Sequence, residues 1–486
     1  MALIARRSLW RHRDFLKIWS AATASSLGSQ ITFIAMPFIA LKMLGASVFQ
    51  VSLLVAVEML PFLLLTLPAG AWLDRVRRRP VLVAADIGRG VVLLSIPVAW
   101  VIGSLTIWHL YAVAFVTGSF TAFFDIADQS YLPAILDRDD LVEGNADLQI
   151  SYAVAQIGGP TMGGNLIAIV AAPWAIAVDA LSFFFSGAFI SAIRRREQKP
   201  VRRLDESGRP TSIRADISDG LRYVLGNRYL RPIAACTGTS NLFGAALFGV
   251  FPVLIWNELK LPPAFYGTVM GAAGVGFLVG AALSSRLPRS LGIGRTIIVS
   301  AALGSPAYVL LTLTPESLGL AAVTLGVGWF VVAMSQVIYN VAQISLRQAI
   351  TAPEMQGRMN ATMRFIVWGT IPIGSVLGGA LATLLPVRVA LILAALASFT
   401  AVVPVLVSPL RSLRNIPSED GPVEGDGAVA GARSPAAPAR APEAAAGSAA
   451  ATSGTAAAPG ALKNEAGLPW TGSPAVRPAS TGVDRS

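Results

Sequence analysis

The sequence predicts an all-α membrane protein with twelve transmembrane helices in two pseudo-symmetric six-helix halves. Of its 486 residues, 54% are hydrophobic and only 13% are charged, about half the charged share of soluble domains. Apolar runs recur along the first 408 positions, and each is long enough to cross a bilayer as a helix of about 20 residues. The runs lack the period-two alternation of a transmembrane barrel, so helices are the expected spanning elements.

The predicted spans fall into two sets of six around a central break. They are 16–43, 48–70, 81–103, 105–126, 148–171, 174–193, 232–257, 265–285, 296–313, 317–346, 360–385 and 387–408. This order predicts an N-terminal half (1–193), a linker (194–231), a C-terminal half (232–408) and a tail (409–486).

Basic residues mark alternate gaps between the spans. One set of gaps holds nearly all of them: Arg6 to Arg13, Arg75 to Arg79, Arg138, Arg194 to Arg231, Arg286 to Arg295, Arg347 with Arg358, and Arg411 with Arg414. The other set holds only Lys42, Lys260 and Arg388. By the positive-inside rule both termini and the central loop are expected in the cytoplasm of a bacterial cell, with the chain in its inner membrane. The net charge of +11 therefore reflects topology, and no nucleic-acid partner is expected.

The N-terminal segment and the rarer residue types argue against several classes of protein and of functional site. The basic N-terminus leads into a long apolar run without a small-residue cleavage site, which predicts a retained first helix. Cys236 is the single cysteine and excludes a disulfide framework, while His12 and His109 are far apart. No metal site, cofactor or catalytic group is expected, and the chain has no nucleotide-binding P-loop.

The linker and the tail differ in residue pattern and composition. Ile213, Ile217, Leu221 and Val224 recur at helical spacing between charged residues, which predicts an amphipathic helix at the cytoplasmic surface. A passive tether between the halves is the alternative. After about residue 415, alanine, proline, glycine and serine dominate, and such a composition predicts disorder.

The two halves repeat a motif at equal spacing. Asn145 precedes Gly163-Gly164 by 18 residues, and Asn360 precedes Gly378-Gly379 by the same interval. Two six-span halves in one orientation are typical of a transporter whose substrate path lies between them.

A basic loop joins the second and third predicted spans. It reads Gly70-Ala-Trp-Leu-Asp-Arg-Val-Arg-Arg-Arg-Pro-Val-Leu82. This segment resembles the loop G-x-x-x-D-R-x-G-R-[RK]-x-x-L of the major facilitator superfamily, and departs from it at Arg77, where the family usually has glycine. A partial copy carries Gly280 and Arg289, with Ser284 in place of the acid. The resemblance extends over residues 10–408 and implies the major facilitator fold.

Further segments resemble one exporter branch of that superfamily. They are the Asp86–Arg89 pair, the stretch from Phe124-Asp125 to Pro133, and Gln356-Gly357-Arg358-Met359-Asn360. The branch contains enterobactin exporters and macrolide-efflux proteins. The stretch Gly159-Pro160-Thr161-Met162-Gly163-Gly164 resembles the helix-5 motif of drug/proton antiporters, although Ala155 stands where an upstream glycine is expected.

The resemblance assigns a gate to the basic loop. In family terms Asp74 ties its helix to the partner half and to arginines of its own loop, through charge-assisted bonds that break during rocking. The gating candidates are Gly70, Asp74, Arg75, Arg78, Arg79, and the pair Asp125 and Gln129 near the end of the fourth span. For the arginines, a purely topological role is the alternative.

Four of the charged residues within the predicted spans lie away from the span ends. A lone carboxylate at mid-membrane depth, such as Glu58, should face a cavity, find a partner or hold a proton. Asp86 and Arg89 share a helix face and are expected to neutralise each other, while Asp179 fits a capping or packing role. These four are the candidates for proton coupling or for a buried ion pair.

The helix-5 motif carries no reactive group. Pro160 removes a backbone donor, and Gly159, Gly163 and Gly164 permit close helix contact. Packing alone and a seal against proton leak are the two readings, and Gly374–Gly379 is the counterpart in the second half.

The cavity candidates come from helices that usually line the substrate path in this superfamily. They are Ser29, Gln30, Asn241, Gln336, Asn340 and Gln343. Interhelical hydrogen bonding is the alternative for each. The first helix lacks the acid found in some multidrug antiporters, which weakens the case for cationic drugs.

The expected function is secondary active export. We expect alternating access, proton antiport, a monomer, and an amphiphilic substrate of the drug, macrolide or siderophore type. A nutrient importer and a non-transporting sensor or scaffold that uses the tail are the alternatives. The sequence names neither the substrate nor the proton-carrying acid.

Overall fold

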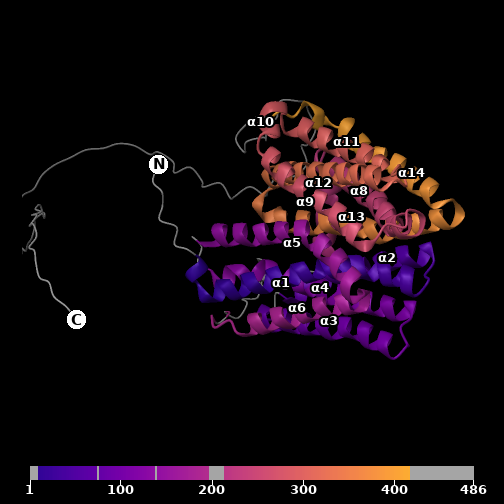
Figure 1. Cartoon of the computed structure of the whole chain (residues 1–486). Helices are drawn as coiled ribbons and strands as arrows, with labels where there is room; N and C mark the ends of the chain where they lie inside the picture. Colours follow the sequence, from indigo (N-terminus) through magenta and orange to yellow (C-terminus); the bar gives the residue numbers. More distant parts are fainter. Residues whose placement is uncertain (1–8, 74–75, 137–139, 196, 198–212, 416–486) are drawn as a thin grey trace, which may run out of the picture. The chain divides into compact units, whose positions relative to one another are not determined.

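The computed structural model describes residues 9–73, 76–136, 140–195, 197 and 213–415, and its regular structure is helical (Figure 1). In this part of the chain, twelve helical segments are long and apolar enough to cross a membrane. The predicted fold class is therefore confirmed.

The spanning helices follow the predicted order. The first half contains α1 (Arg13–Phe38) with its π-helical continuation η2 (Ile39–Met43), α2 (Val48–Leu73), α3 (Arg78–Val101), α4 (Ile107–Ile135), α5 (Leu141–Val170) and α6 (Ala172–Ser191). The second half contains α8 (Leu230–Val253) with η4 (Leu254–Glu258), α9 (Pro263–Ser284), α11 (Ile293–Thr312), α12 (Leu318–Ala349), α13 (Pro353–Leu384), and α14 (Val387–Ala397) with η5 (Ser398–Val402) and α15 (Val403–Leu406). Shorter elements are η1 (Leu9–Arg11), α7 (Ile213–Gly226), α10 (Leu287–Leu291) and η6 (Pro409–Ser412).

Three helices are longer than their apolar runs predict. Helix α4 continues to Ile135, α5 begins at Leu141, and α13 begins at Pro353. The additional turns carry charged and polar residues. Hydropathy locates the part of a helix that lies in the lipid, whereas a helix can continue into the aqueous layer.

The first helix of each half ends in the same irregular way. Pro37 precedes the π-turn η2, and Pro252 precedes the π-turn η4. Proline lacks a backbone N–H, so the ladder of hydrogen bonds is interrupted and a wider turn forms beside it. The two turns lie close together, because the rings of Phe38 and Trp256 meet edge to face with centroids 5.1 Å apart.

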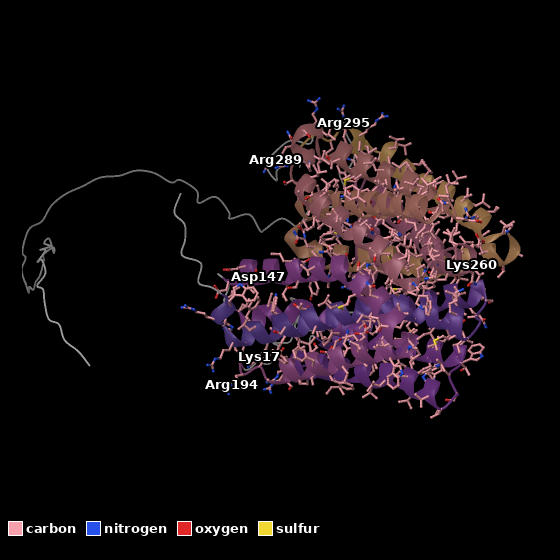
Figure 2. The ribbon with its side chains drawn as sticks, viewed as in Figure 1. Lys17, Asp147, Arg194, Lys260, Arg289 and Arg295 are labelled. Carbon is pink, nitrogen blue, oxygen red and sulfur yellow. The ribbon has the colours of Figure 1, made fainter. Side chains whose placement is uncertain are left out.

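The two ends of the helix bundle differ. Figure 2 shows Arg194 and Arg289 at one end, here called the basic end, and Lys260 at the opposite end. Near Lys260, buried apolar side chains of both halves form one continuous core. At the basic end each half has a separate core, one around Phe15 and Tyr131 and the other around Ile233 and Leu346. The halves are thus joined at the Lys260 end and packed independently at the basic end.

Helix α7 occupies the linker segment for which the sequence predicts an amphipathic helix. Its Val224 is fully buried in the basic-end core of the second half. A Cβ added to Gly220 would lie 2.3 Å from Oγ1 of Thr362 on α13, and Arg358 pairs with Asp219 at 3.7 Å. Helix α7 is therefore packed against the start of α13. Residues 198–212 and the tail from 416, with its predicted disorder, lie outside the described residues.

Candidate transport site

The two halves meet through α5 with α9 and through α2 with α13 and α8. At the first contact, a Cβ added to Gly164 would lie 2.4 Å from the carbonyl oxygen of Pro263, and one added to Gly267 would lie 2.2 Å from that of Pro160. Thr161 donates a hydrogen bond to the carbonyl of Gly267 at 3.2 Å. Only a missing side chain permits backbones to approach so closely.

The glycine pairs of the two halves have equivalent environments. Gly163 packs against α1 and its neighbour Gly164 against α9, in the other half. Gly378 packs against α8, and Gly379 against Ser52 of α2, again in the other half. In each pair, one glycine serves the contact inside its half and the next serves the contact between halves.

Gly164→Val is expected to abolish export, because the valine side chain would enter the backbone of α9 and force α5 and α9 apart. Overpacking of this kind costs about 1–3 kcal/mol. The matched control is Gly158→Val in the same helix, where an added Cβ would meet no atom within 4 Å apart from the local backbone of α5 itself. Efflux of a fluorescent dye from cells, normalised to membrane protein level, compares the two variants. Equal efflux from both would show that this close contact is dispensable.

The charged centre of the first half lies between α3, α4 and α6. Asp86 is fully buried, and Arg89 is 5% exposed. Arg89 forms a salt bridge to Asp86, whose second oxygen accepts a hydrogen bond of 2.6 Å from Ser186. The guanidinium carbon lies 4.3 Å and 4.2 Å from the ring centroids of Phe124 and Phe183. The helix spacing places this pair on one face, and two aromatic rings enclose its cation.

Further carboxylates surround Arg89. Asp179 accepts hydrogen bonds from Thr32 of α1 and, at 3.1 Å, from Ser182, and it lies within electrostatic reach of Arg89. Asp125 and Asp128 of α4 also interact electrostatically with Arg89. Asp128 was missed by the sequence reasoning, although its three-residue spacing from Asp125 places both on one face of α4.

Arg89 therefore lies among four carboxylates and cannot neutralise them all. Its Nε has no hydrogen-bond partner in the described part of the chain. Excess carboxylate in a membrane interior is costly unless protons or further cations neutralise it. Such a group is suited to binding and releasing protons.

Glu58 stands apart from this group. It is half-buried in α2, and no described residue donates a hydrogen bond to its carboxylate. Its backbone carbonyl oxygen lies at a close contact between α2 and α4, 2.2 Å from a Cβ added to Gly118. The side chain of Gln129 lies outside the described residues, so the predicted pair with Asp125 cannot be placed.

The basic loop is described at its two ends. Helix α2 carries Gly70 in its last turn and ends at Leu73, while Asp74 and Arg75 lie outside the described residues. Arg77 has φ −69° and ψ 136°, an extended conformation open to any residue. The departure from glycine at this position therefore strains nothing.

Glu197 holds the start of α3 and was missed by the sequence reasoning. Its carboxylate accepts hydrogen bonds from the backbone N–H groups of Arg78 (2.8 Å) and Arg79 (3.2 Å) and from the Arg78 side chain (3.1 Å). The Arg79 side chain donates to the carbonyl of Ser191 at the end of α6. On α1, Asp14 accepts from the N–H of Arg195 at 3.0 Å. The segment after α6 thus joins the basic ends of α1 and α3.

Glu197→Gln is expected to lower the free energy of unfolding by about 1–2 kcal/mol, because a charged cap at a helix N-terminus is lost. The carboxylate is 4% exposed, so solvent screens it little. Glu316→Gln, an exposed acid before α12, is the control and should change nothing. Thermal unfolding in detergent compares both with the parent. An unchanged midpoint for Glu197→Gln would contradict the capping role.

The sequence matches the family model described as transmembrane secretion effector over residues 7–423. The chain belongs to this major facilitator family. The multidrug efflux pump Tap of Mycobacterium tuberculosis is 28% identical over 375 residues, covering 76% of this chain and 86% of the pump. The Tap pump of Mycolicibacterium fortuitum is 27% identical over 375 residues, covering 76% and 88%. The family and these relatives are transporters, not enzymes.

Solved structures share the secretion-effector fold. A bacterial homologue of the iron transporter ferroportin, in an inward-facing state, has a TM-score of 0.65 at 17% identity and covers 82% of this chain and 99% of that one. A mutant of the nucleoside transporter NupG has a TM-score of 0.65 at 12% identity, covering 81% and 98%. These likenesses concern the fold alone.

The predicted cavity residues of this secretion-effector chain have different surroundings. Asn241 donates to the carbonyl of Val367 at 2.9 Å, and Gln30 packs against Gly159, so both serve helix contacts. Gln343 is buried and donates to Asn340 at 3.4 Å. Ser29 and Gln336 are exposed. In the described part of the chain no group of three or more His, Cys, Asp or Glu residues could hold a metal ion.

Proposed function

We propose that the chain is a secondary active exporter of amphiphilic small molecules that works by alternating access and proton antiport. The observation that carries the proposal is the arrangement of the cores: the halves share one core at the Lys260 end and have separate cores at the basic end. Two bodies joined in this way can rock about the shared region. We place the basic end and both termini in the cytoplasm.

The surroundings of Arg89 support proton coupling. Asp86, Asp125, Asp128 and Asp179 outnumber the cation among them, and all four belong to one half. Protons can bind there and leave without disturbing the contacts between α5 and α9. Similarity to the multidrug efflux pump Tap supports drugs as the substrate class, and we expect the transporter to act as a monomer.

Efflux measurements in a bacterial host that lacks its own pumps test this proposal. Cells that express the chain should tolerate a wider set of amphiphilic drugs and expel a fluorescent dye, and a protonophore should stop the efflux. A chain lacking residues 416–486 should still export. Protection of no compound and no gradient-dependent efflux would overturn the exporter proposal, and uptake of a labelled nutrient would favour an importer.

Asp74→Asn is expected to abolish export while membrane insertion stays intact, because the amide cannot form the charged bonds expected of a gate at the end of α2. Asp140→Asn, at the start of α5 and without a capping bond, is the control and should export normally. Dye efflux at matched membrane protein levels measures both. Full export by Asp74→Asn would remove this residue from the mechanism.

A further inference from the structure

Helices α2 and α13 enclose a pocket between the two halves. Its lining includes Phe62 of α2, and Arg364, Phe365 and Trp368 of α13. The guanidinium carbon of Arg364 lies 4.9 Å from the centroid of the Trp368 ring, and the centroid of that ring lies 4.9 Å from the centroid of the Phe62 ring. None of the described residues that line the pocket is acidic. The pocket therefore presents one cation beside an aromatic wall.

Arg364 has no bonded counter-charge. In the described part of the chain no carboxylate forms a salt bridge with its guanidinium, and no residue accepts a hydrogen bond from it. Asp125 on α4 interacts with it electrostatically, without a bond. The hydroxyl of Thr66, which also lines the pocket, already donates to the carbonyl of Phe62. A cation within a membrane span is costly unless it is compensated, so this guanidinium is a donor that an anion can use.

The helical geometry of α13 directs Arg364 toward the interior of the bundle. On this helix Gly378 packs against α8, and Gly379 packs against α2. At about 100° per residue, Arg364 lies between these two faces, about 40° from Gly378 and about 60° from Gly379. Ile373, which is 60% exposed, lies on the opposite side, about 180° from Arg364. Because α2 and α8 also contact each other, the sector that holds Arg364 faces inward and the opposite side faces lipid.

The pocket lies at the level where the packing of the two halves separates. Along α2 it is located between Leu54 of the shared core and Leu73 of the basic-end core of the first half. Along α13 it is located between Ala382 of the shared core and Met359 of the basic-end core of the second half. A substrate that enters from the basic end between the halves would meet this pocket before it reaches the shared core.

We propose that this pocket binds the acidic group of an amphiphilic substrate, such as a carboxylate or sulfonate next to an apolar ring system. The proposal rests on the proposed export function and narrows its class of substrate. The acidic group would accept the N–H bonds of Arg364, and the ring system would lie against Phe62 and Trp368. The space is about 260 Å³, part of it open, whereas a drug-sized ligand occupies pockets of about 300–1,000 Å³. It therefore suits one end of the substrate.

A phospholipid head group carries the same kind of charge. Arg364 points away from the exposed side of α13, so a lipid would have to pass between α2 and α13 to reach it. A solute that enters between the halves is therefore the favoured occupant.

Two probes that differ by a single acidic group test the pocket. Anilinonaphthalene sulfonate has this group, and phenylnaphthylamine is the same ring system without it. Calorimetric titration of the full chain in nanodiscs of zwitterionic lipid, with empty nanodiscs subtracted, measures the binding of each. The parent should bind the sulfonate more tightly than the uncharged probe. Arg364→Gln should weaken binding of the sulfonate about tenfold and leave the uncharged probe unaffected, which also shows that this variant is folded.

Further variants separate the charge from the shape of the side chain. Arg364→Lys keeps the charge but loses the planar group that stacks on Trp368, so an intermediate affinity for the sulfonate is expected. Arg388→Gln, whose cation pairs with Glu258 at 3.2 Å, is the matched control and should bind both probes as the parent does. Equal affinity of the parent for the two probes, or parental affinity for the sulfonate in Arg364→Gln, would overturn the pocket.

Quenching of Trp368 by brominated lipids tests the other occupant. The difference in fluorescence between the parent and Trp368→Phe isolates this residue. Brominated phosphatidylglycerol should quench it no more than brominated phosphatidylcholine does, and stronger quenching would place an acidic lipid in the pocket and overturn the substrate assignment. The titrations require no proton gradient, so a failure of drug export would overturn the proposed function without touching this result. Export of uncharged dyes without any preference for the sulfonate in binding would overturn the pocket alone.

Discussion

Arg89→Gln is expected to reduce the drug tolerance conferred by this transporter to that of host cells without it, while the protein still folds. Arg89 is the cation among Asp86, Asp125, Asp128 and Asp179. Without it, these carboxylates can neutralise themselves by holding protons, so the fold survives. Carboxylates that keep their protons cannot release them to the cytoplasm, and proton-coupled export stops.

Arg89→Lys separates charge from shape. Lysine keeps the positive charge but loses the planar group that stacks between Phe124 and Phe183, so intermediate export is expected. Tolerance assays and proton release from liposomes, driven by a drug gradient, measure both variants. Export by Arg89→Gln at the parental rate would show that the carboxylates work without a counter-charge.

The twelve spans could be predicted from composition because lipid requires every span to be an apolar helix. A run of about 20 apolar residues therefore indicates a span directly. The ends of α4, α5 and α13 could not be predicted in this way, because polar residues outside the lipid can be helical or not. The full length of α4 matters, because it places Asp128 well inside the helix.

The site was predictable only where partners are close in the sequence. Asp86 and Arg89 are three residues apart, and helix geometry alone brings them together. Glu197 has its partners, Arg78 and Arg79, more than a hundred residues away, at the start of a helix whose contact with it no local pattern reveals. The repeat in the sequence did reveal the equivalence of Gly163-Gly164 and Gly378-Gly379. It did not show that the second glycine of each pair forms the contact between the halves.

Asp86→Asn is expected to be far more destabilising than Arg89→Gln, although each removes one member of the same pair. An acid can neutralise itself with a proton, whereas arginine keeps its charge. Asp86→Asn would leave a buried cation without its bonded carboxylate, and such a loss lowers the free energy of unfolding by about 3–5 kcal/mol. Ser186→Ala, which removes only the hydrogen bond to Asp86, should cost about 1–3 kcal/mol.

The double variant Asp86→Leu with Arg89→Met tests whether the broken ion pair causes the instability expected of Asp86→Asn. Replacing a buried ion pair by apolar residues of similar volume is often neutral or stabilising, so this protein should unfold close to the parental temperature and yet export nothing. Thermal unfolding in detergent, together with dye efflux, distinguishes the outcomes. If the double variant were as unstable as Asp86→Asn, packing around Asp86 would be the cause rather than the loss of the carboxylate bonded to Arg89. Stability without export would instead show that the first half retains this ion pair for transport and not for folding.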